Sequence, residues 1–190
     1  MPLESFETSP TPFPIGDRPM LEYGPRGGGD AAEQCLRIRA RRVFPASRKE
    51  LFAAWTTRPA CESWLGFRAH SRAVVKPYAG GAFRLELAEG PIIHVITGST
   101  VEVRIGEFVS FTWIHHDRDD YGSIVDVTFG QRRDQSELCL VHHAIASRRE
   151  AAWLMRLWAA ALDRLEHYLV PRTTGSVASV VAARRTSSAA

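Results

Sequence analysis

The most constraining feature of the sequence is a series of segments in which apolar and polar residues alternate. One long amphipathic helix follows this series. The alternation has the two-residue period of half-buried strands, with turn residues such as Gly80-Gly81 between the segments. An early strand is predicted at LRIRARRVF (36–44). Six further strands are predicted at about 68–76, 82–88, 92–103, 107–115, 123–130 and 136–144. Because the connections are short, we expect an antiparallel sheet of seven strands.

Three helices are predicted around these strands. Ser47 and Glu50 have the spacing of a capping box, and Pro59 suits the first turn of a second short helix that ends near Gly66. Residues 148–169 form a helix about 33 Å long, at 1.5 Å per residue. Its apolar face carries Leu154, Trp158, Leu162, Leu165 and Leu169. The helix has the length to cover the curved sheet, which predicts an α+β helix-grip fold with two short helices after the first strand.

Five segments in this order resemble one known family. They are RRVFPASRKELFAAWTTRPACESWLG, KPYAGGAFRLEL, TGSTVEVRIGEFVSFTW, ELCLVHH and WAAALDRLEHYL. Together they are similar to the heat-shock protein 90 ATPase activator homologue-like family of the START-like (SRPBCC, Bet v-type) superfamily, over about 36–169. The resemblance implies the helix-grip fold and leaves the reaction open, since members bind diverse hydrophobic ligands. Where that family often has glycine, this chain has Leu157, whose larger side chain reduces the space for a cavity.

The phase of the strands assigns side chains to the expected gap between sheet and helix. Apolar positions on each strand, together with the helix tryptophans, point to that gap, and Tyr121 is expected to close its mouth. The ligand cavity candidates are Trp64, Phe83, Leu85, Phe111, Trp113, His115, Tyr121, His142 and Trp158. Aromatic walls with two imidazoles suit a small hydrophobic or aromatic molecule. The same side chains are equally consistent with a solid core.

Several classes of site are not expected. The pairs His115-His116 and His142-His143 alternate across a strand, so neither pair can chelate one ion, and we expect no metal or other cofactor. Three cysteines without close spacing indicate no disulfide framework. No G-x-S-x-G motif is present, and no catalytic residue is assigned. The net charge of +3 is dispersed, which argues against nucleic acid as a partner.

The chain is expected to consist of one domain with two tails. We predict a flexible N-terminal arm at 1–34, a START-like helix-grip domain at 35–170 and a flexible C-terminal tail at 171–190. The absence of an 18-residue apolar run or a signal-like start favours a cytoplasmic protein that does not enter the membrane. With 22 Arg against 2 Lys, the composition suggests a GC-rich, bacterial coding bias. A monomer or a homodimer is expected.

The sequence favours a protein that binds a small hydrophobic molecule and has no evident catalytic motif. One alternative is a polyketide cyclase/dehydrase-like enzyme in which His115 or His142 moves a proton, because imidazole titrates near neutrality. A second alternative is an activator or adaptor of a chaperone ATPase, which requires an exposed apolar patch. Whether the chain is an enzyme stays open at this point.

Overall fold

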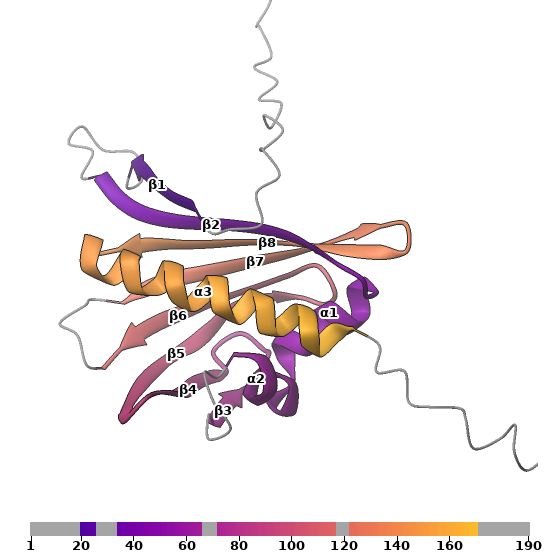
Figure 1. Ribbon diagram of the computed structural model, residues 1–190, viewed down its shortest axis with the longest axis horizontal. Coiled ribbons are helices and arrows are strands. Elements are labelled where there is room, and N and C mark those ends of the chain that lie inside the picture. The colour runs from indigo at the N-terminus through magenta and orange to yellow at the C-terminus, as the bar shows by residue number, and fades with distance from the viewer. Residues whose placement is uncertain (1–19, 26–33, 66–71, 117–121, 171–190) are drawn as a thin grey trace, which may run out of the picture.

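One curved antiparallel sheet holds the molecule together. The computed structural model describes residues 20–25, 34–65, 72–116 and 122–170 (Figure 1). Its strands pair in the order β1-β2-β8-β7-β6-β5-β4-β3. They are β1 (Met20–Pro25), β2 (Gln34–Phe44), β3 (Arg72–Val75), β4 (Ala82–Glu89), β5 (Ile92–Arg104), β6 (Phe108–His115), β7 (Ser123–Arg132) and β8 (Gln135–Ile145). The seven predicted strands are all present.

The sheet has one strand more than the seven predicted. β1 pairs with β2 from Met20↔Arg39 to Pro25↔Gln34. It lies within the segment expected to be a flexible arm, before residue 35 where the domain was expected to begin. The sequence gives little sign of this strand because MLEYGP is short and ends in glycine and proline, which are poor strand formers. Backbone pairing with β2, rather than the strand propensity of its own residues, holds β1 in the sheet.

Three helices complete the predicted helix-grip fold. They are α1 (Arg48–Thr56), α2 (Arg58–Trp64) and α3 (Arg148–Leu169). The capping box is confirmed, because the Glu50 N–H donates to Ser47 Oγ and the Ser47 N–H donates to Glu50 Oε2. The N-cap of α3 is Ser147, whose Oγ accepts from the Glu150 N–H. None of the described helices is long and apolar enough to cross a membrane.

The apolar face of α3 lies on the sheet, as its period predicts. Leu154, Trp158, Leu162 and Leu165 are fully buried, whereas Leu169 is only half-buried. The last turns of α3 lie beside α1 and α2 (Figure 1). Arg164 joins them, because its Nε donates to the Trp64 carbonyl at 2.8 Å. This contact fixes the C-terminal end of α3 against the helix pair.

The pairing of β2 with β8 contains an irregularity near the start of α3. Leu36 pairs with Ile145 and Ile38 pairs with His142, so that one residue of β2 faces two of β8. This is a β-bulge, which bends a strand and changes the direction of nearby side chains. One of the two residues is Ala144, whose φ of 59° lies in the left-handed region.

Candidate functional site

The predicted cavity residues lie together in the interior. Eight of the nine candidates are buried, namely Trp64, Phe83, Leu85, Phe111, Trp113, His115, His142 and Trp158. The ninth, Tyr121, lies outside the described residues. Trp113 and Trp158 lie in contact, with ring centroids 5.4 Å apart, and the Phe83 and Phe111 centroids are 4.4 Å apart. These rings therefore pack on one another.

Little space is left between these side chains. Two voids of about 10 Å³ each border them, which is about the space of one water molecule. One void is mainly apolar and touches Trp64, Phe83 and Phe111; the other touches Trp113 and His115. Leu85, His142 and Trp158 border neither void. Among the described residues, side chains occupy most of the gap in which a ligand was expected, and Leu157 is fully buried.

His142 is held in one neutral form by its neighbours. The Trp158 Nε1–H donates to His142 Nδ1 at 3.0 Å, so the ring proton is on Nε2 and is donated to Ser123 Oγ at 2.7 Å. Ser123 Oγ in turn donates to the Trp113 carbonyl at 3.2 Å. Burial, and then the charge of His143, lowers the pKa of His142 to about 3. With both nitrogens engaged, His142 is not placed to act as a base on a ligand.

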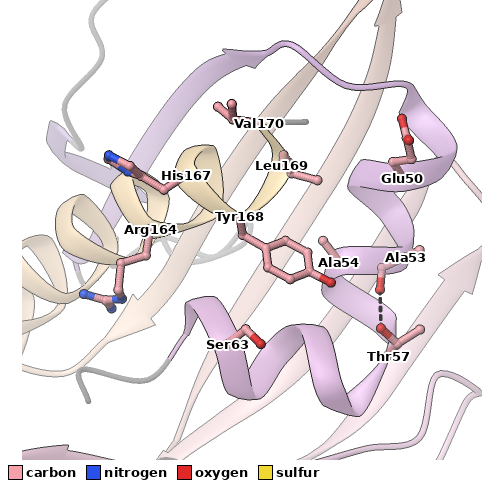
Figure 2. A pocket seen from close by; sticks show the side chains of 10 residues that line it. All are labelled: Glu50, Ala53, Ala54, Thr57, Ser63, Arg164, His167, Tyr168, Leu169 and Val170. Carbon is pink, nitrogen blue, oxygen red and sulfur yellow. Dashed lines mark hydrogen bonds between the residues drawn. The ribbon is translucent and has the colours of Figure 1, made fainter. Parts of the chain in front are cut away.

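A much larger hollow lies outside this core, where α1, α2 and the end of α3 meet (Figure 2). It is a groove of about 810 Å³. The residues lining it are Glu50, Ala53, Ala54, Thr57, Ser63, Arg164, His167, Tyr168, Leu169 and Val170. The Tyr168 side chain points between α1 and α2 (Figure 2) and is 45% exposed. We call this hollow the helix groove.

Three side chains at the helix groove offer hydrogen-bond acceptors. The hydroxyl protons of Thr57 and Ser63 are donated to the carbonyls of Ala53 and Pro59. Their oxygen lone pairs are therefore what a bound molecule meets. His167 Nδ1 lies 2.7 Å from the Asp163 carbonyl, so Nδ1 carries the proton and Nε2 accepts when the ring is neutral.

Two charged groups border the helix groove. The hydrogen bond from the Ser47 hydroxyl, followed by that from the Ser47 backbone, lowers the pKa of Glu50, which stays ionised at neutral pH. Burial lowers the pKa of Arg164, partly offset by the Asp163 charge. The Arg164 guanidinium is directed towards the end of α2, where it binds backbone carbonyls.

Sequence reasoning missed the helix groove, although two signals for it exist. α2 begins at Arg58, directly after the extended residue Thr57 and with Pro59 in its first turn, so α1 and α2 cannot continue as one helix. Tyr168 places a half-exposed aromatic ring on the last turn of α3, next to Leu169. In the described part of the chain, no group of three or more His, Cys, Asp or Glu side chains is placed to hold a metal ion.

Comparison with known proteins identifies a family and a fold. The family model for activator of Hsp90 ATPase homolog 1-like proteins matches residues 45–170. Protein CV1439 from Chromobacterium violaceum is 22% identical, with a TM-score of 0.64 over 71% of this chain and 97% of that chain. CalU16 from Micromonospora echinospora is 19% identical, with a TM-score of 0.59 over 80% and 87%.

A third similar structure is PFC0360w, described as an HSP90 activator from Plasmodium falciparum. It is 20% identical, with a TM-score of 0.59 over 70% of this chain and 95% of that chain. At these identities the likeness of the three structures shows the fold alone. No curated protein matches the sequence.

Proposed function

The chain belongs to the activator of Hsp90 ATPase homolog 1-like family, and on that premise we propose that it binds a small, largely apolar molecule in the helix groove. The observation that carries this proposal is the volume of the groove, about 810 Å³. Sites for small molecules typically measure about 300–1,000 Å³ and are largely formed before the ligand arrives. The interior voids, at about 10 Å³ each, fall far below that range.

The lining of the helix groove indicates the kind of molecule it accepts. Ala53, Ala54 and Leu169 supply apolar walls, and the Tyr168 ring offers a face for stacking. Stacking on such a ring contributes about 0.5–1.5 kcal/mol beyond burial. The acceptor oxygens of Thr57 and Ser63 favour a ligand that carries N–H or O–H donors on one edge. A flat aromatic molecule with an amine, amide or hydroxyl edge meets these requirements.

The interior aromatic cluster is the second candidate place for the same ligand. Trp64, Phe83 and Phe111 border an apolar void there. A ligand enters this space only by displacing packed rings. Its apparent affinity is therefore the intrinsic affinity multiplied by the fraction of molecules whose interior is open. The two places make opposite predictions for substitutions in the groove and in the core.

The proposal is tested with a chemically varied panel of small aromatic molecules, screened by ligand-observed NMR and measured by calorimetry. Ser63→Trp fills the groove from α2, and Tyr168→Ala removes its ring. We expect each to raise the Kd at least about tenfold. Ala152→Trp is the matched control, because Ala152 is exposed on α3 and does not line the groove.

The control should keep the Kd within about twofold. Full affinity in both groove variants would refute binding at the helix groove. Weakening by Phe111→Leu instead would place the ligand in the interior. No binding by any member of the panel would contradict small-molecule binding as the function.

A second candidate function is activation of a chaperone ATPase, which the family description supports. One feature of this chain favours it. Ile92 and Ile93 are 55% and 59% exposed where β5 begins, and exposed apolar side chains are what an adaptor presents to its partner. The ATPase rate of purified Hsp90 should then rise with this protein and fall back with Ile92→Ser/Ile93→Ser. An unchanged rate at saturating protein would exclude this function.

A further inference from the structure

Four titratable side chains form a continuous row from the surface to the interior, at the end of α3 that is remote from the helix groove. Glu89 Oε2 lies 3.0 Å from His94 Nε2, and His94 Nδ1 lies 3.1 Å from His115 Nε2. His115 Nδ1 then lies 3.5 Å from Glu150 Oε1. His115 and Glu150 are buried, at 2% and 4% exposure, whereas the Glu89 side chain is 49% exposed. We call these residues the Glu–His row.

The Glu–His row has the connectivity of a proton relay. Glu89, when ionised, accepts the proton on His94 Nε2, which leaves His94 Nδ1 to accept from His115 Nε2–H. His115 Nδ1 then faces Glu150 with a lone pair when both rings are neutral. The four side chains come from β4, β5, β6 and α3, and Trp153 covers them, stacked on His115 with centroids 4.7 Å apart.

A small void lies at the buried end of the row. Its volume of about 10 Å³ suits one water molecule or one hydroxyl group. His115, Glu150 and Ser123 border it, and so does Trp113. The Trp113 Nε1–H is buried and has no hydrogen-bond partner among the described residues. A buried donor without a partner is unfavourable, and a hydroxyl oxygen in the void would supply an acceptor.

The backbone beside this void is strained. Ala144 borders it and has a φ of 59°, a left-handed conformation that is unfavourable for a residue with a Cβ. It belongs to the β8 bulge opposite β2. Bulges and strained residues concentrate next to functional sites. The void also reaches towards the surface, because Ala146, which borders it too, is exposed.

We propose that this void is a second binding site, for a hydroxyl group, at which Glu150 and the rest of the Glu–His row exchange a proton with the bound group. On abstraction, the O–H bond breaks and its proton passes to the Glu150 carboxylate and then to His115 Nδ1. His115 gives its Nε2 proton to His94, and His94 gives its own to Glu89, which releases it to water. The Trp113 N–H stabilises the oxygen that has lost its proton. The site is an acid–base centre for water or a small alcohol.

The relay is tested by titrating the His94 and His115 rings by NMR in the full chain. Glu89→Gln removes the carboxylate at the exposed end of the row. We expect this change to shift the titration midpoint of His115 by at least about 0.3 pH unit, although Glu89 contacts His94 rather than His115. Glu89→Asp keeps a carboxylate and should therefore return the His115 midpoint most of the way to the wild-type value. The matched control is Glu86→Gln, because Glu86 also lies on β4 but pairs with Arg84.

A His115 midpoint that stays within about 0.1 unit of the wild-type value in Glu89→Gln would overturn the relay. The same holds for an equal shift in the Glu86→Gln control, which would show a general electrostatic effect. Because Glu89 is half-exposed, its variant should fold, and the backbone amide spectrum provides the check.

The hydroxyl site is tested with ethanol as the probe. We expect a saturable shift of the Trp113 indole proton with ethanol, abolished by Ala146→Val, which narrows the void, and kept in Ala152→Val. A nuclear Overhauser effect between this proton and a long-lived water, without any ethanol shift, would identify water as the hydroxyl that the site holds. Absence of both the water signal and the ethanol shift would overturn the proposal.

Discussion

Replacing His142 with glutamine should make the protein less sensitive to acid. His142 is fully buried, and burial, with the charge of His143, lowers its pKa to about 3 in the folded chain. In the unfolded chain the ring titrates near pH 6.5. As the pH falls below about 6.5, the unfolded state binds a proton that the folded state does not bind. The free energy of unfolding therefore decreases by about 1.4 kcal/mol per pH unit until about pH 3.

At pH 4.5 this difference amounts to about 3 kcal/mol, since two pH units separate that condition from the unfolded pKa. His142→Gln lowers stability at pH 7 because it loses the hydrogen bonds with Trp158 and Ser123. The informative quantity is therefore the slope of the unfolding free energy against pH, measured by urea denaturation between pH 6 and pH 4. The variant's slope should be smaller than the wild-type slope by about 1.4 kcal/mol per unit.

The matched control is His116→Gln, because His116 is exposed and bonds only to the Thr97 hydroxyl among the described side chains. It should keep the wild-type slope. Equal slopes in the wild type and His142→Gln would refute the reasoning, because His142 would then take up a proton in the folded state. Acidic groups contribute equally to both chains and cancel in the comparison.

Two substitutions and one labelling reaction test the packing of the core and the capping of α1. Leu162→Ala should lower the free energy of unfolding, measured by urea denaturation, by about 2–5 kcal/mol, because the Leu162 side chain is fully buried. Leu169→Ala should lower it clearly less, because Leu169 is half-buried. Equal losses would mean that α3 does not cover the sheet as described. Cys61 should react with a thiol reagent far more slowly than Cys139, because burial raises the pKa of Cys61 to about 12. Faster labelling of Cys61 than of Cys139 would contradict that burial. Ser47→Ala should lower the melting temperature through the loss of a helix cap worth about 1 kcal/mol, and an unchanged temperature would show that the capping box contributes nothing.

Local patterns predicted the fold well because its elements follow strong periods. The two-residue alternation placed seven strands, and the face of α3 that carries Leu162 is buried as expected. The capping box at Ser47 marked the start of α1. β1 escaped prediction because backbone pairing with β2, rather than its own composition, brings it into the sheet.

The sites were less predictable, because periodicity tells which face a side chain occupies and says nothing of the space around it. Trp113 and Trp158 face each other, but their rings fill the gap that was expected to be a cavity. The helix groove arises where three helices approach one another, a contact between distant parts of the chain. Likewise, Glu89 and His94 carry no motif, and only the pairing of β4, β5 and β6 aligns them with His115.

The most direct test of the central claim is an NMR measurement of intermolecular contacts between the full chain and a ligand selected from the panel. If the helix groove is the binding site, the ligand protons should show nuclear Overhauser effects to the Ala53 methyl group and the Tyr168 ring. Contacts to the rings of Phe83 and Phe111 instead would contradict the account, because they would show that the packed interior opens to hold the ligand.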